Sequence, residues 1–324
     1  MIFSSASFLF AFLPCVAIVY YLLRSRTARN VFLTLVSLFF YAWGEPWFVL
    51  VMLLSIVINW FIALRIGAGE HKKAWLVVGL VCDLGLLAVF KYLGFLMENV
   101  NWIFRLSLPV PQIVLPIGIS FFTFQAISYI IDVYRGDGRV QKNLMNVCLY
   151  ISFFPQLIAG PIVRYQTFDD QITTRRETLD DFCEGVRRFI VGLAKKVLLA
   201  NNLAALADTV FAMKTTELSL VGTWLAAASY MLQLYFDFSG YSDMAIGLAR
   251  MFGFHLLENF NLPFIARSIA GFWKRWHISL TSWFRDYLYF PLGGSRVSKG
   301  RLLFNMGVVW VLTGFWHGAQ WTYL

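Results

Sequence analysis

Phe272-Trp273-Lys274-Arg275-Trp276-His277 opens the C-terminal stretch around which the rest of the chain is organised, and Gly314-Phe315-Trp316-His317-Gly318 lies near its close. Each of these sequences sets a histidine beside a tryptophan. The second lies inside an apolar run that extends from Met306 to Tyr323. An ionisable side chain at membrane depth is costly and therefore marks a candidate functional group. We interpret the upstream chain as the membrane-embedded body that holds these groups.

Composition places the chain among membrane proteins. Of its 324 residues, 59% are hydrophobic and only 14% are charged, whereas soluble domains carry about 25% charged residues. Several apolar runs approach the ~20 residues that a helix needs to cross a bilayer. We therefore predict an all-α polytopic membrane protein, a multi-helix transmembrane bundle with re-entrant or broken helices and interfacial helices. Residues 1–324 are predicted to form a single transmembrane domain.

The charges and cysteines exclude other classes of protein. The formal net charge is +9, but the charges lie in short loops between apolar runs. That pattern is typical of cationic loops kept in the cytoplasm and argues against a nucleic-acid partner. Four cysteines are widely scattered, so their spacing suggests neither a metal site nor a disulfide framework: Cys15, Cys82, Cys148 and Cys183. We expect no bound metal ion.

Basic residues after the first apolar run set the expected orientation. Phe8–Leu23 is followed at once by three arginines, Arg24, Arg26 and Arg29. This end of the run should face the cytoplasm, which places the N-terminus outside it. The run lacks the flanks of a cleaved signal peptide and is predicted to stay as the first span. The expected location is the inner (plasma) membrane of the cell.

Glycine, proline and charge shape the later runs. The Gly44-Glu45-Pro46 sequence predicts a turn between two spans. Pro155 and Gly160-Pro161 interrupt the next long run, so Phe153–Arg164 is either a re-entrant, broken segment or a kinked span. Two segments mix charged and apolar residues. Lys91–Arg105 could lie along the membrane surface rather than cross, and Phe182–Leu206 is predicted to lie along the surface.

Two carboxylates lie in the longest apolar region, Leu220–Phe254. Asp237 and Asp243 are exceptional there, because acidic residues within apolar helices are rare. One interpretation is structural: they hydrogen-bond to neighbouring helix ends or pair with a cation such as Lys274 or Arg275. The other is a direct role in chemistry. The sequence leaves both open.

The four histidines differ in their surroundings. His71 lies in a basic loop and is expected to be solvated, and His255 follows a predicted helix end at the interface. Aromatic and apolar neighbours should limit water near His277 and His317, where a neutral imidazole could accept a proton. A structural role remains the alternative for each. The chain has no Walker A, Gly-x-Gly-x-x-Gly, His-Glu-x-x-His or Gly-x-Ser-x-Gly sequence.

At this point the sequence resembles the membrane-bound O-acyltransferase family, and within it the bacterial alginate O-acetylase branch. The resemblance covers nearly the whole chain, in order. It is carried by Leu115–Phe121, Ser128–Gly136, Phe153–Pro161, Gln233–Ala245, Glu258–Asn261, Trp276–Leu280, Trp283–Tyr289 and Trp316–Ala319.

The resemblance implies acyl transfer at the membrane. His317 matches the presumed catalytic histidine of the family and His277 the second motif histidine. Lys274, Arg275, Asp237, Asp243 and Trp316 are expected to support the site or to stabilise an oxyanion. The resemblance implies no tightly bound cofactor, with acetyl-CoA or an acyl-carrier thioester as co-substrate. It also implies three kinds of partner: the bilayer, a polysaccharide acceptor and periplasmic acetyl-relay or acetyltransferase proteins.

Family members continue for several spans beyond the second histidine, whereas this chain stops at Leu324 inside an apolar run. We therefore expect it to be truncated at its C-terminus. Two other functions stay open. Broken helices and buried carboxylates are also features of a transporter or flippase for an acyl group or glycan precursor. A truncated chain could also be a membrane subunit without catalytic activity.

Overall fold

The computed structural model describes residues 1–323, without the side chain of Thr215, and all regular structure in that part of the chain is helical. This confirms the predicted all-α class. Backbone contacts separate the chain into two compact units. The first comprises Met1–Arg29, Ala159–Pro161 and Thr173–Ile278, and the second comprises Asn30–Ile158, Ile162–Ile172 and the chain from Ser279 on. The single transmembrane domain stays a prediction.

The first unit contains the helices η1 (Phe8–Phe12), α1 (Leu13–Leu22), α10 (Leu179–Ala194), η3 (Lys195–Ala200), α11 (Asn201–Phe211), η4 (Thr215–Glu217), α12 (Leu220–Met251), η5 (Pro263–Ile265) and α13 (Ile269–Trp273). The others belong wholly or mainly to the second unit: α2 (Arg26–Gly44), α3 (Phe48–Gly67), α4 (Lys72–Leu87), η2 (Ala88–Tyr92), α5 (Leu93–Phe104), α6 (Ile119–Arg135), α7 (Leu144–Ser152), α8 (Phe154–Leu157), α9 (Tyr165–Thr174), α14 (Ile278–Phe284), η6 (Arg285–Tyr289), α15 (Lys299–His317) and η7 (Trp321–Tyr323).

Three helical stretches among the described residues are long and apolar enough to cross a membrane: Phe48–Gly67, Lys72–Phe104 and Leu179–Phe211. The segments expected to lie on the membrane surface, Lys91–Arg105 and Phe182–Leu206, fall largely within the last two, and their location at the surface stays a prediction. Lys91 donates from Nζ to the backbone oxygen of Trp316, and the cations in Leu179–Phe211 that α12 neutralises are described below.

The predicted break near Pro155 is confirmed. Helix α7 ends at Ser152, and Phe153 turns the backbone with ψ 111° before the short helix α8 begins. Pro155 lies in the first turn of α8, where its missing N–H removes no helical hydrogen bond. The Gly44-Glu45-Pro46 turn is also confirmed, since α2 ends at Gly44 and α3 begins at Phe48.

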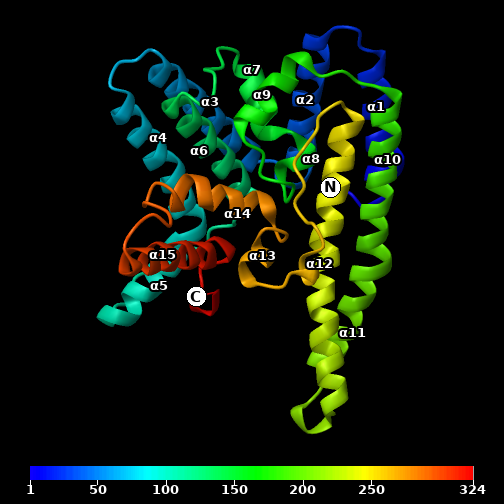
Figure 1. Cartoon of the computed structure of the whole chain (residues 1–324), viewed down its shortest axis with the longest axis vertical. Helices are drawn as coiled ribbons and strands as arrows, with labels where there is room; N and C mark the ends of the chain where they lie inside the picture. The colour runs from blue at the N-terminus through cyan, green and yellow to red at the C-terminus, as the bar shows by residue number, and fades with distance from the viewer. Residues whose placement is uncertain (324) are drawn as a thin grey trace. The chain divides into compact units, whose positions relative to one another are not determined.

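Glycines bring the backbones of α10 and α12 into contact (Figure 1). A Cβ on Gly185 would lie 2.7 Å from the Gly247 carbonyl oxygen, and one on Gly192 would lie 2.6 Å from that of Gly240. The two helices are antiparallel, so Gly185 on α10 faces Gly247 on α12, and Gly192 faces Gly240. Small residues at such positions let membrane helices pack closely. The close packing sets the side chains of α10 and η3 against those of α12.

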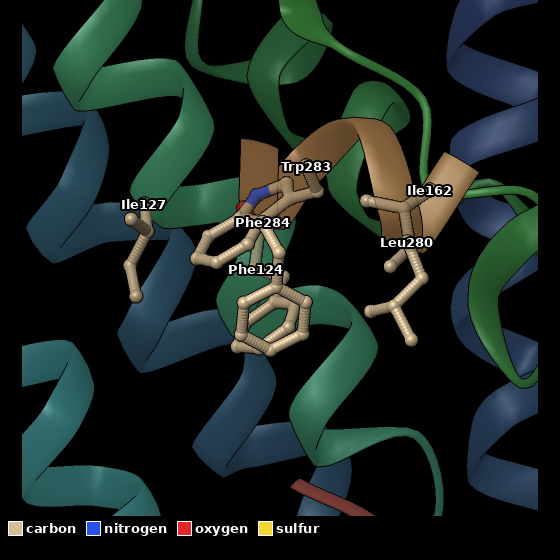
Figure 2. Packing of buried hydrophobic residues seen from close by; sticks show 6 residues of the cluster. All are labelled: Phe124, Ile127, Ile162, Leu280, Trp283 and Phe284. Carbon is tan, nitrogen blue, oxygen red and sulfur yellow. The ribbon is translucent and has the colours of Figure 1, made fainter. Parts of the chain in front are cut away.

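Aromatic packing organises the second unit. Phe124 on α6 and Trp283 on α14 stack with ring centroids 4.0 Å apart and an angle of 4° between their planes. Ile127, Ile162, Leu280 and Phe284 complete the buried cluster (Figure 2). Trp283 Nε1 donates a hydrogen bond to Ser128 Oγ at 2.8 Å. The indole ring is thus fixed by stacking on Phe124 and its N–H by Ser128.

One buried carboxylate gathers the basic residues that follow the first span. Glu177, whose side chain is 6% exposed, pairs with Arg26, with Arg29 at 2.8 Å and with Arg175 at 3.5 Å. Tyr20 donates its hydroxyl to the same carboxylate. Two of the arginines used above to orient the chain, Arg26 and Arg29, therefore tie the start of α2 to the segment that precedes α10, and Tyr20 adds the end of α1.

Replacing Glu177 with Gln is expected to lower the free energy of unfolding by about 3 to 5 kcal/mol, since removing one member of a buried charge group leaves the others uncompensated. Burial raises the pKa of Glu177, but hydrogen bonds from Arg26 and Tyr20 outweigh it and hold the pKa below its usual range. Because the pKa of Glu177 is lower in the folded than in the unfolded protein, the carboxylate stabilises the fold at any pH above its unfolded-state pKa. This stabilisation is lost as the pH falls through the folded-state pKa. Thermal unfolding in detergent at pH 7 and in acid measures this.

The exposed pair of Arg187 with Glu184 gives the control. Arg187→Gln should leave the unfolding temperature unchanged at pH 7, because exposed ion pairs contribute little. Equal unfolding temperatures for Glu177→Gln and the wild type at pH 7 would show that the arginine group does not stabilise the fold.

Candidate active site

His277 is buried and held in an unusual backbone conformation. The residue is only 4% exposed. Its backbone φ of 43° lies in the left-handed region, which non-glycine residues seldom adopt. The backbone N–H of the next residue, Ile278, donates to the Asn259 carbonyl at 2.9 Å, and His277 Nδ1 lies 3.2 Å from Asn259 Oδ1. Such strained residues persist where the surroundings hold them, and they cluster at functional sites.

Aromatic rings enclose the imidazole. The Phe238 ring lies edge-on at 4.6 Å from the His277 ring, and the Phe260 ring lies 6.4 Å away. Trp276 packs against Phe260 at 5.2 Å and against Phe272 at 5.6 Å. The surroundings predicted for His277 from its aromatic neighbours in sequence are therefore confirmed, although the rings come from three separate segments.

The two carboxylates of α12 pair with cations from the neighbouring helix. Asp243 contacts Arg188 at 2.8 Å and Lys195 at 2.6 Å, and Asp237 pairs with Lys196. The predicted partners, Lys274 and Arg275, are wrong. Sequence proximity suggested them, whereas the glycine contact between α10 and α12 supplies the actual partners. Pairing favours the structural interpretation of both carboxylates.

A polar cavity of about 140 Å³ opens beside this ion-pair group. Its lining includes Arg188, Asp243 and Glu258 together with Ser239, Ser242 and Asn259. Since one water needs roughly 10 to 15 Å³ of such space, the cavity has room for several waters or a small hydroxylated group. Asn259 links it to His277, since Asn259 Nδ2 donates to Ser242 Oγ at 3.0 Å.

The two cations next to His277 in sequence have different surroundings. Arg275 Nη1 donates to the Asn261 carbonyl at 3.0 Å, and the Asn261 N–H donates to the Arg275 carbonyl at 2.9 Å. Arg275 therefore braces the segment that carries Asn259. Lys274 is exposed, and within residues 1–323 its ammonium has no ion pair.

His317 ends helix α15 in the second unit. Its ring lies 4.8 Å from that of Trp316 and its side chain is exposed within the described chain, so the limited access of water expected there stays a prediction. Trp316 is half-buried and packs against Phe121 at 5.8 Å, and its carbonyl accepts from Lys91. Exposure leaves the imidazole accessible to a substrate.

The predicted site residues thus fall into two groups. The first unit holds His277, Lys274, Arg275, Asp237 and Asp243, and the second holds His317 and Trp316. His71 and His255 are exposed, and His255 lies 3.8 Å from Asp181. No group of three or more possible metal-binding acidic, histidine or cysteine side chains occurs among residues 1–323.

Sequence reasoning missed two residues. Asn259 lay inside a recognised motif but had no assigned role, because its contact with His277 joins positions 18 residues apart. Lys91 is a lone cation in an apolar segment, which is a signal for a functional group. Its donation to Trp316 next to His317 was not visible in the sequence.

Comparison with known proteins identifies the family. The sequence model of the membrane-bound O-acyltransferase family (MBOAT) matches residues 139–324. The chain is 48% identical to a probable alginate O-acetylase of Pseudomonas aeruginosa, an alignment that covers all of this chain and 63% of that protein. It is 38% identical to a peptidoglycan O-acetyltransferase of Helicobacter pylori, over all of this chain and 68% of that protein.

A teichoic acid D-alanyltransferase of Bacillus subtilis is 33% identical, over 64% of this chain and 55% of that protein. The chain thus spans less than two thirds of the length of the Pseudomonas aeruginosa relative. The motif-bearing segments around His277 and His317 both lie inside the part that the family model matches. This membrane protein belongs to the membrane-bound O-acyltransferase family.

Proposed function

We propose that this protein transfers an acyl group, in the first instance acetyl, from a cytoplasmic thioester towards an exported polysaccharide such as alginate. The transfer is either direct or passes through a partner protein. The names of the relatives support this reading, since they share acyl transfer and differ in the acceptor. The observation that carries it is the buried His277, held by Asn259 within an aromatic enclosure.

The proposed chemistry needs one base and one stabiliser of negative charge. His317 removes the proton from an acceptor hydroxyl, whose oxygen attacks the thioester carbonyl carbon. The new C–O bond forms, the C–S bond breaks, and the thiolate that leaves recovers the proton. His277 serves as a second acid–base group or, with Lys274 or Arg275, stabilises the oxyanion. General base catalysis typically contributes ~100- to 10,000-fold, and one oxyanion donor about 100- to 1,000-fold.

The donor and partners follow from the same proposal. The donor is acetyl-CoA or an acyl-carrier thioester, bound as a substrate, and no metal takes part. The acceptor is the polysaccharide or a periplasmic relay or acetyltransferase protein. The basic residues after α1 support a cytoplasmic end there and an N-terminus outside, in the inner membrane. Asp237 and Asp243, the carboxylates that suggested a transporter, pair with cations, which favours the enzyme.

The test follows labelled acetyl in membranes that contain this protein. With labelled acetyl-CoA or a labelled acetyl-carrier protein as donor, these membranes should form an acetyl ester on polysaccharide or on a partner protein. The donor that gives the higher rate is taken as the substrate. Vesicles that move labelled glycan precursor without forming an acetyl ester would instead show a transporter. Complex assembly with neither activity would show a structural subunit.

A further inference from the structure

Asn259 holds His277 through both its backbone and its side chain. Its backbone carbonyl accepts from the N–H of Ile278, and its side-chain Oδ1 lies 3.2 Å from His277 Nδ1. Asn259 is fully buried. Its Nδ2 donates to Ser242 Oγ at 3.0 Å, which turns the amide oxygen towards the imidazole. An amide oxygen can only accept a hydrogen bond, so the proton of this contact belongs to Nδ1.

We propose that Asn259 is a positioning residue that keeps His277 in its Nδ1-protonated form, so that Nε2 is the nitrogen that exchanges a proton during acyl transfer. The assignment rests on the proposed function and narrows it. A neutral imidazole with its proton on Nδ1 has a lone pair on Nε2. His277 is then the second acid–base group of the proposed reaction, in addition to His317 as the base for the acceptor hydroxyl, and a neutral Nε2 cannot donate to an oxyanion.

An amide suits this task better than a carboxylate would. Both accept from Nδ1–H and orient the ring, but only a carboxylate adds a negative charge that favours the imidazolium. Inside an aromatic enclosure, a neutral partner therefore keeps the imidazole available as a base. Ser242 on α12 accepts the hydrogen bond that fixes the Asn259 amide. The polar cavity lined by Ser242 and Asn259 puts this amide next to space that water can enter.

The carboxylates named on the surrounding elements are all paired with cations. On α12, Asp243 pairs with Arg188 and Lys195, and Asp237 pairs with Lys196. Glu258, next to Asn259, also pairs with Arg188. On the segment that carries His277 itself, Arg275 donates to a backbone carbonyl and Lys274 is exposed. The neutral amide of Asn259 thus makes a direct polar contact with the ring, and this contact places the proton on Nδ1.

Nitrogen NMR tests the tautomer without reference to catalysis. The chain has four histidines, so labelling them with ¹⁵N and comparing the wild type with His277→Gln identifies the His277 signals. We expect a protonated Nδ1 and an unprotonated Nε2 in the neutral form. A protonated Nε2 with a bare Nδ1 would overturn the proposal, because the Asn259 amide would then face the other way. Failure of acetyl transfer in the wild type would instead refute the proposed function and leave the tautomer result standing.

The pH dependence of acetyl transfer tests the role in turnover. In Asn259→Asp, the added carboxylate favours the imidazolium, so the acidic limb of the profile should move to higher pH. Asn202→Asp adds the same charge at an exposed position of helix α11 that does not line the cavity, and its profile should match the wild type. Asn259→Leu should lose about 10- to 100-fold in kcat, as partners of metal-bound histidines do, with KM unchanged. An unmoved acidic limb in Asn259→Asp would exclude the positioning role.

Discussion

Replacing His317 with Ala is expected to reduce acetyl transfer by about 100- to 10,000-fold, the range of a lost general base. The protein should still fold, because the imidazole is exposed and makes no hydrogen bond among residues 1–323. The loss should appear in kcat at saturating thioester, since the base acts on the acceptor hydroxyl and not on donor binding. Initial rates in membranes, together with the unfolding temperature of the purified variant, measure both parts.

His255→Ala is the matched control, because His255 is also exposed and lies at the end of a segment close to Asp181. Its rate should equal that of the wild type. Normal turnover in His317→Ala would remove His317 from the mechanism and leave His277 as the remaining histidine base. A loss of rate accompanied by unfolding would show a structural role for His317 and would also contradict the prediction.

Gly192→Leu is expected to disrupt the pairing of α10 with α12 and to lower the unfolding temperature by about 5 to 10 °C, the effect of overpacking by about 3 kcal/mol. A Cβ at Gly192 would lie 2.6 Å from the Gly240 carbonyl oxygen. The obstacle is backbone, which cannot rotate away as a side chain can. The helices must separate, which also pulls Lys195 and Lys196 away from their carboxylates.

Gly85→Leu tests whether bulk alone explains the effect. Gly85 lies in helix α4, and a Cβ there would meet no atom within 4 Å. This variant should keep the wild-type unfolding temperature. Equal stability of Gly192→Leu and the wild type would mean that the close contact of α10 with α12 is not needed for the fold.

Local patterns in the sequence were sufficient for the class of protein and for most helices. Apolar runs of bilayer length depend only on neighbouring residues, and so do the turn at Gly44-Glu45-Pro46 and the break at Pro155, because proline restricts its own backbone and its immediate neighbours. The motifs around His277 and His317 also indicated the family. Charge left one point open, since four cations in Phe182–Leu206 suggested a surface helix, whereas the helix that contains them is long and apolar enough to cross a membrane.

The tertiary structure decided which groups meet. Sequence neighbours suggested Lys274 or Arg275 as partners of Asp237 and Asp243, but the partners lie on the helix that the glycines hold against α12. The contact of Asn259 with His277 likewise joins residues 18 positions apart. The sequence by itself determined the membrane-embedded helices and the family, because these follow from local hydrophobicity and motif order. The ion pairs and the orientation of His277 could be known only from the folded chain. They depend on contacts between segments far apart in sequence, α10 with α12 and the Asn259 segment with His277.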